Sequence, residues 1–302
     1  MTLARTARPT LTPVELDEGE SLAFTLVNGE TRTLTCKRTG AHVHATTLEE
    51  LKVEEPGART IIGFFVDLEI DGYPVSLKRM VGDDASFYQP YDLFGLRIWP
   101  DAVDALFEYM TETHGECRPR KAFRFAVQDA SLRDCPVRLH PWCPLPAGGL
   151  RIADCYDSDD CWLGAYHGAS AHGGLDINHL AGTVLTAPFA VDRHGWFNHL
   201  DRGDNNNRWR GEHRWPDGST WILQSHHLIR LLVPADQPIE AGTPYAETAG
   251  VLIGGHEHTH FVFRVREADG IETLLDPWIL FYWMYQDLDT ATVRRLPSGR
   301  IP

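Results

Sequence analysis

Positive charge is scarce in this sequence. The 302 residues include 28 Lys and Arg against 42 Asp and Glu, which gives a formal net charge of −14. This excess argues against nucleic acid or an anionic membrane surface as a partner, because both would be repelled. The hydrophobic fraction of 43% is that of an ordinary folded protein.

Long apolar runs are missing as well. The first ten residues contain Arg5 and Arg8 but no apolar core, so no signal peptide is visible. The apolar run at 279–285 has only seven residues, too few to cross a bilayer. We therefore expect no transmembrane segment, and a cytoplasmic location stays open.

The cysteines do not form a zinc knuckle, because none has the C-x-x-C spacing, and a chain of this length is no small disulfide scaffold. Cys155 and Cys161 bracket an acidic turn. A disulfide between them and two buried thiols are equally compatible with the sequence. The spacing of the turn's aspartates matches no EF-hand, so we expect a solvated turn rather than a calcium loop. These aspartates are Asp154, Asp157, Asp159 and Asp160.

The first half of the chain has the patterns of a β-rich domain. Two pairs of strand-like segments flank Asn-Gly or Asp-Gly, the strongest short hairpin signal. A further strand is expected at 123–127. Given as strand, turn and strand, the hairpins are 21–27, Asn28-Gly29 and 31–36, then 61–70, Asp71-Gly72 and 73–80.

One helix and a domain boundary are also predicted in this half. Pro100 suits a first helical turn, and the apolar residues after it fall on one stripe. The passage 141–149 is rich in Pro and Gly, which is typical of a connection between domains. We therefore expect a β-rich domain with one helix at 1–150 and a second domain at 151–302. The stripe comprises Val103, Leu106, Phe107 and Met110.

Metal-ligating residue types recur at suggestive spacings in the second half. His172-x-x-x-Asp176 combines a nitrogen and a carboxylate ligand, and His258-Thr259-His260 places two histidines on one face of a strand. Two nitrogens and a carboxylate make a three-ligand zinc site with a fourth position for water. Each pair alone is weak, since the chain has 15 histidines and a second H-x-H at His42 and His44.

The neighbouring residues strengthen this interpretation, because five ordered segments resemble the lysostaphin-like zinc endopeptidases of bacterial cell walls. The resemblance covers about 161–285, which is under half of the chain. It implies a C-terminal antiparallel β-sheet peptidase domain outside the cytoplasm. The segments are Tyr166-His167-Gly168 with His172 and Asp176, then 174–188, then 227–242, then 258–261, then Asp276-Pro277-Trp278.

The resemblance also implies a role for individual residues. His172, Asp176 and His260 would bind zinc, and His258 would be the general base. His227 would lie near the water or the developing oxyanion. Tyr166 would donate a hydrogen bond to the tetrahedral intermediate.

Three histidines leave alternatives open. His226 competes with His227, although an ungapped match favours His227. His256 shares a strand face with the H-x-H pair and could act as a ligand, whereas His167 is expected to have a structural role or to orient a ligand.

The activity expected from the resemblance is cleavage of peptidoglycan cross-links, with glycyl bonds as candidates. A catalytically silent member that binds wall peptide or a partner enzyme is one alternative. A related zinc carboxypeptidase acting on D-amino acid termini is another. The Trp-rich passage 191–221 is expected to form either a wall of the substrate groove or a surface loop.

Overall fold

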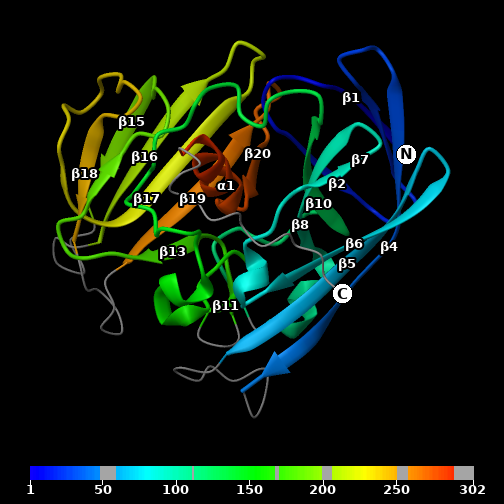
Figure 1. Cartoon of the computed structure of the whole chain (residues 1–302), viewed down its shortest axis with the longest axis horizontal. Coiled ribbons are helices and arrows are strands. Elements are labelled where there is room, and N and C mark those ends of the chain that lie inside the picture. The colour runs from blue at the N-terminus through cyan, green and yellow to red at the C-terminus, as the bar shows by residue number, and fades with distance from the viewer. Residues whose placement is uncertain (48–58, 111, 167–169, 199–205, 250–257, 289–302) are drawn as a thin grey trace. The chain divides into compact units, whose positions relative to one another are not determined.

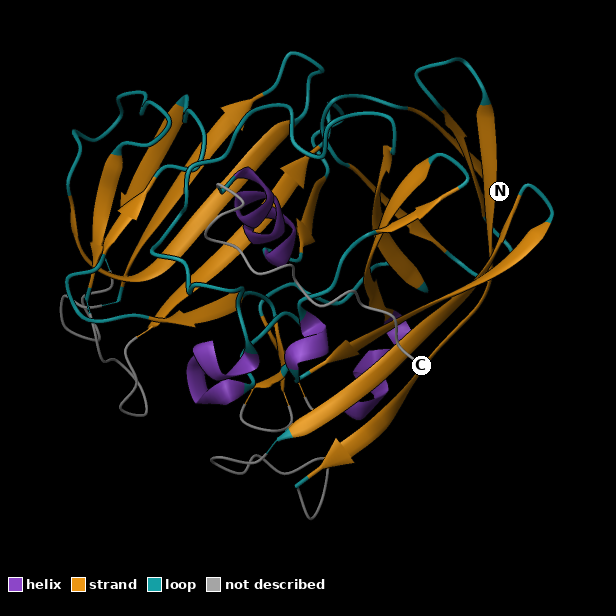
Figure 2. Cartoon of the chain, in the orientation of Figure 1, coloured by secondary structure: helices purple, strands orange, loops and turns teal. Residues whose placement is uncertain are grey.

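The computed structural model describes residues 1–47, 59–110, 112–166, 170–198, 206–249 and 258–288, and strands dominate it (Figure 2). The chain divides into two compact units. Among the described residues, the first contains 1–136 and 163–173, and the second contains 137–162 and 174–288. A division into domains at residue 150 stays a prediction. In the structure the segment 163–173 packs with the first unit.

The first unit consists of three sheets, with strand orders β1-β3-β4-β5-β6, β2-β10-β8-β7 and β11-β12-β9. Both predicted hairpins are confirmed, as β3 with β4 and β5 with β6. The strands are β1 (Thr2–Thr6), β2 (Thr12–Leu16), β3 (Ser21–Thr25), β4 (Thr31–Thr46), β5 (Thr60–Ile70), β6 (Tyr73–Val81), β7 (Tyr91–Leu93), β8 (Leu96–Val103), β9 (Glu112–His114), β10 (Phe123–Asp129), β11 (Ala165–Tyr166) and β12 (Ser170–His172).

The predicted helix of the first unit is confirmed only in part: a 3-10 helix at Asp104–Tyr109 contains Leu106 and Phe107, but no helix begins at Pro100. Pro100 lies within β8, every residue of which is buried, and only short 3-10 helices occur among the described residues of this unit, at Asp84–Ser86 and Asp104–Tyr109. The register between β8 and β10 shifts between Arg124 and Phe125, where Phe125 faces Pro100. A bulge tolerates proline because the missing N–H interrupts no regular ladder there.

The second unit is built on one large antiparallel sheet with the order β13-β19-β17-β16-β15, to which β14, β18 and β20 attach. Helix α1 lies across this sheet (Figure 1). The strands are β13 (Leu175–Asn178), β14 (Val184–Thr186), β15 (Arg193–Phe197), β16 (Asn207–Arg214), β17 (Thr220–Leu231), β18 (Pro244–Thr248), β19 (His258–Arg266) and β20 (Glu272–Leu275). The helices are α1 (Trp278–Asp287) and 3-10 helices at Ile152–Asp154 and Tyr156–Ser158.

The two faces of this sheet differ in chemistry because strand residues alternate in direction. On β19, Phe261 and Phe263 face α1 and its surroundings. The ring centroids of Phe261 and Phe281 are 5.3 Å apart, and those of Phe263 and Trp221 are 5.5 Å apart. The back face of β19 is therefore apolar and packed. The opposite face carries His258, His260 and the arginines that follow them.

The Trp-rich passage is not a plain surface loop over its described part, and its role as a groove wall stays a prediction. It forms β15 and β16, and Trp209, Trp215 and Trp221 are buried in the core. Trp209 stacks on Tyr245 with ring centroids 4.0 Å apart. Side chains alternate along β16, so Trp209 points inward and its charged neighbours point outward. The passage contains so many polar residues that this two-residue period is hard to recognise in the sequence.

All six cysteines are buried free thiols, so Cys155 and Cys161 form no bridge. Burial is the main cause that raises the pKa of Cys155 well above its ordinary value. Within the described ranges, no helix is long and apolar enough to cross a membrane.

A buried hydroxyl network fixes the strand that leads to the histidines. Trp142 Nε1 donates to Tyr245 Oη at 2.8 Å, and Ser225 Oγ lies 2.5 Å from the same oxygen.

Tyr245→Phe should lower the free energy of unfolding by about 1–3 kcal/mol, because buried polar groups lose their partner. Urea unfolding measures this change. The exposed Tyr73→Phe serves as the control, and equal midpoints for both variants would contradict the expectation.

Candidate metal centre

The pairing of β13 with β19 brings Asp176 and His260 together across 84 residues of sequence. The two residues are directly opposed in the register, and His260 Nδ1 lies 2.7 Å from Asp176 Oδ1. His258 Nε2 lies 3.5 Å from the other carboxylate oxygen. All three residues are buried. A carboxylate thus lies between two imidazoles of one strand, with its donor atoms removed from solvent.

Gly174 permits this close approach. A Cβ at position 174 would lie 2.3 Å from Cε1 of His260 and 2.8 Å from the backbone oxygen of Phe261. No real Cβ tolerates such distances to a neighbouring backbone atom. The glycine beside Asp176 is therefore required by the packing of β13 against β19.

Strand β17 supplies two further histidines through an irregularity. Regular alternation would turn His226 and His227 to opposite faces, but His227 has a φ of 63° and the strand's register shifts just beyond it. A positive φ at a non-glycine residue is uncommon, and a bulge redirects the side chain. The regular register of β17 and β19 brings the ring of His226 to 4.7 Å from that of His260, and the irregularity brings the ring of His227 to 4.6 Å from that of His258.

Asn206 orients the ring of His227. Its Oδ1 lies 2.9 Å from His227 Nδ1. A carboxamide oxygen only accepts, so Nδ1 carries the proton and Nε2 is left as an acceptor. Burial, followed by the charge of His258, lowers the pKa of His227 to about 3, which keeps the ring neutral at pH 7.

Asp160 belongs to the same part of the second unit. The expectation of a solvated turn is wrong for Asp159 and Asp160, whereas Asp157 is exposed and Asp154 half-buried. Both Asp159 and Asp160 are buried, and the backbone N–H of Asp176 donates to the carbonyl oxygen of Asp160 at 3.0 Å. Burial and repulsion from Asp176 raise the pKa of Asp160 well above its ordinary value. The turn is drawn inward because its backbone pairs with the strand that carries Asp176.

These residues fit a divalent metal. Two buried carboxylates would repel each other without a cation, and imidazole with carboxylate is a common zinc donor set. Asp160 Oδ2 and His226 Nε2 are buried and have no hydrogen-bond partner among the described residues. Buried polar atoms are nearly always paired, so a missing ion is a natural explanation for such atoms.

The remaining predicted residues, His172 and Tyr166, belong to the first unit. His172 is buried at the end of β12, where its N–H donates to the carbonyl of Gly164 at 3.0 Å. Its ring stacks on that of His114, 5.7 Å away, because β12 pairs in parallel with β9. Tyr166 ends β11. Histidine is a common metal ligand, so both His172 and His114 could bind a metal. Within the second unit, the predicted ligands Asp176 and His260 are brought together, whereas the predicted ligand His172 belongs to the first unit.

Sequence reasoning missed several residues of this site. Tyr156 is buried, with its ring 4.2 Å from that of His258, and burial first of all raises its pKa to about 12. Asn206 lies far along the chain from the motifs, and no spacing relates it to His227; the same holds for His114 beside His172 within the first unit. Only Asp160 had a signal, its place in the acidic cluster. His167 and His256 lie outside the described residues.

Comparisons with known proteins give structural matches only. No family model and no curated protein matches the chain. Lysostaphin from Staphylococcus simulans matches at a TM-score of 0.32 and 17% identity, over 41% of this chain and 48% of that one. The chain thus covers about half of the length of lysostaphin.

Two other solved structures match over most of their length. A putative M23 peptidase from Pseudomonas aeruginosa has a TM-score of 0.32 and 14% identity, over 91% of this chain and 93% of that one. A zinc-containing peptidase from Vibrio cholerae has a TM-score of 0.33 and 13% identity, over 87% and 83%. The activity of this chain is therefore inferred from its own residues.

Removing a ligand tests the metal centre. Asp176→Ala and His260→Ala should each abolish stoichiometric zinc binding, because each variant lacks one donor of the ligand set expected from the sequence. Elemental analysis of the purified variants measures the zinc content. His42→Ala with His44→Ala, in the exposed second H-x-H, is the matched control and should keep wild-type zinc. Full zinc content in the Asp176 or His260 variant would place the metal elsewhere.

Proposed function

We propose that this protein is a zinc-dependent endopeptidase that hydrolyses peptide cross-links of bacterial peptidoglycan. The carboxylate of Asp176 carries this proposal, because it lies 2.7 Å from His260 and 3.5 Å from His258 in a buried cluster of histidines. His172, which three residues separate from Asp176, would complete the ligand set with Asp176 and His260. The proposal places the protein outside the cytoplasm, where its substrate is.

When bound, zinc would supply Lewis-acid chemistry that activates water and polarises the scissile carbonyl. His258 would take the proton from the attacking water and return it to the leaving amine. His227 would orient that water, since its Nε2 is the acceptor side of a ring held by Asn206. This tautomer favours a contact with the water over one with the oxyanion. Tyr166 would donate a hydrogen bond to the tetrahedral intermediate.

Glycyl bonds are the first candidates for the substrate, because Tyr166-His167-Gly168 is most similar to the glycyl-glycine cutters of the resembled family. A catalytically silent protein that binds wall peptide is the alternative from another class. The presence of every residue type that zinc-dependent peptide hydrolysis needs argues against a catalytically silent protein. A zinc carboxypeptidase acting on D-amino acid termini is the third candidate.

A panel of cross-bridge peptides separates these functions. The zinc-loaded wild type should cleave within glycyl or D-alanyl cross-bridges, as mass spectrometry of the products would show, and a chelator should stop the cleavage. Release of single terminal residues would identify a carboxypeptidase. Binding of the peptides without turnover would identify the silent protein.

The general base can be separated from the ligands. His258→Ala should keep its zinc yet lose about 10²–10⁴-fold in rate, because a positioned base supplies that factor. Tyr166→Phe removes only a hydroxyl and should cost about 10²-fold in kcat. Steady-state kinetics with zinc analysis on the same samples measure both. Loss of zinc in His258→Ala would instead make His258 a ligand.

The two histidines of β17 should behave differently. His227→Ala should lower kcat about as much as His258→Ala, and Asn206→Ala should produce a smaller fall through loss of ring orientation. His226→Ala should matter much less, although its ring lies beside His260. The comparison uses kcat at saturating substrate. A larger defect in His226→Ala than in His227→Ala would exchange their roles.

A further inference from the structure

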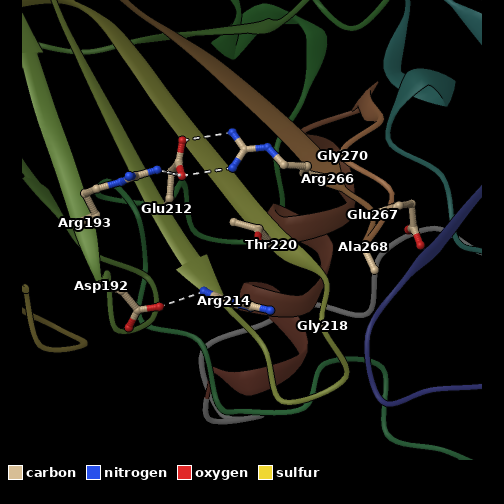
Figure 3. Close-up of a pocket in the computed structure, with 10 residues that line it drawn as sticks. All are labelled: Asp192, Arg193, Glu212, Arg214, Gly218, Thr220, Arg266, Glu267, Ala268 and Gly270. Atoms are coloured by element: carbon tan, nitrogen blue, oxygen red, sulfur yellow. Dashed lines mark hydrogen bonds and ion pairs between the residues drawn. The ribbon is translucent and has the colours of Figure 1, made fainter.

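The sheet face that carries the histidines has ion pairs at one end and packed rings at the other. At the charged end, Glu212 accepts hydrogen bonds from Arg193 and Arg266 (Figure 3). Three arginines and three acidic residues line a cavity of about 400 Å³ there, so its charges balance. At the histidine end, the ring of His258 contacts other rings instead. One of these rings, that of Tyr156, comes from a 3-10 helix outside the sheet.

The imidazole of His258 has two ring neighbours. The ring centroid of Tyr156 lies 4.2 Å away with the planes inclined by 33°, and that of His227 lies 4.6 Å away with the planes inclined by 68°. Asn206 holds the ring of His227 in turn. Tyr156 is 2% exposed and His258 is 5% exposed. Because both side chains are buried in packed surroundings, the imidazole can turn only if a neighbouring ring gives way.

The residue before Tyr156 is tied to β13. Cys155 forms a backbone bridge with Ile177, and Asn178 Nδ2 donates to the carbonyl oxygen of Cys155 at 2.9 Å. The register of β13 and β19 sets the same Asn178 opposite His258. One short strand therefore fixes both the backbone that carries the tyrosine and the backbone that carries the histidine.

The turn after Tyr156 is closed by two residues in the left-handed conformation. Asp157 has a φ of 46° and Ser158 a φ of 58°, which is uncommon for residues other than glycine. The N–H of Asp160 donates to the carbonyl oxygen of Tyr156 at 3.2 Å, and the carbonyl oxygen of Asp160 accepts from Asp176 at 3.0 Å. Strained residues persist only where the surrounding structure fixes them, and they cluster at functional sites. Here they hold a tyrosine ring against the proposed general base.

We propose that Tyr156 is a positioning residue that fixes the orientation of the His258 imidazole. The inference rests on the proposed function, in which His258 takes the proton from the attacking water. A general base must stay within hydrogen-bond reach of that proton, and a displacement of about 1 Å can cost a factor of about 10² in rate. The flat ring of the tyrosine makes the contact, so a phenylalanine would serve and an aliphatic side chain would not.

Steady-state kinetics on the full-length, zinc-loaded chain test this role. Tyr156→Leu keeps apolar bulk but removes the ring, so it should keep zinc and KM while kcat falls about tenfold, less than for loss of the base itself. Tyr156→Phe should restore wild-type kcat. Tyr282→Leu is the matched control, because Tyr282 is also a buried tyrosine of the second unit, with its ring 6.2 Å from that of Trp278. It should keep wild-type kcat.

A double-mutant cycle shows whether Tyr156 acts through His258. In a protein that already carries His258→Ala, Tyr156→Leu should cost no further activity, because the base that it positions is absent. A second fall of about tenfold on that background would mean that Tyr156 acts on another group, and it would overturn the inference. Wild-type kcat in Tyr156→Leu alone would overturn it as well.

An NMR measurement separates this inference from the proposed function. With histidine isotope-labelled at Cε1, the signal of His258 is identified by its absence from His258→Ala. The current of the Tyr156 ring displaces this signal, so it should move in Tyr156→Leu and stay in place in Tyr156→Phe. If the zinc-loaded wild type cleaves no peptide, the peptidase function fails, and a signal that moves as expected still supports the positioning of the ring. An unmoved signal in Tyr156→Leu overturns the inference whatever the activity.

Discussion

The pairing of β13 with β19 is the constraint on which the candidate site depends. It opposes Asp176 to His260 and permits the 2.7 Å contact between them only because residue 174 is glycine. The same pairing positions His258 beside the second carboxylate oxygen. A shift of register by one residue would turn Asp176 to the other face and dissolve the cluster. The site is thus a direct product of strand register.

The two faces of the large sheet have different roles: one packs into the core, and the other carries the candidate site. The back face carries the buried residues Trp209, Trp221 and Phe261, of which Trp221 and Phe261 have ring contacts with Trp283 and Phe281 of α1. Such a core holds the strands rigid, as a site of fixed geometry requires. The front face carries the histidines at one end of β19 and the arginines at the other. The positive φ of His227 is an irregularity of β17, and it adds this side chain to the histidines of the front face.

The sequence predicted the two hairpins and a strand that carries His258 and His260 on one face, because these depend on local periodicity and spacing. It placed the start of the helix wrongly at Pro100. A strand accommodates this proline because of a bulge against the neighbouring strand, which the local sequence pattern does not reveal. It also missed Asn206, Tyr156 and His114. Their contacts with the site's histidines arise from tertiary packing, which leaves no pattern in the chain. The burial of Asp159 and Asp160 was not foreseen, because it accompanies a backbone hydrogen bond from Asp176 to Asp160.

The central claim is that one zinc ion is held by His172, Asp176 and His260. A crystal of the zinc-loaded protein, measured on both sides of the zinc absorption edge, tests it most directly. The account predicts a single strong anomalous peak per chain, about 2.0–2.2 Å from a donor atom of each of the three residues. An anomalous map without a peak at Asp176 and His260, or with its peak at His42 and His44, would contradict it.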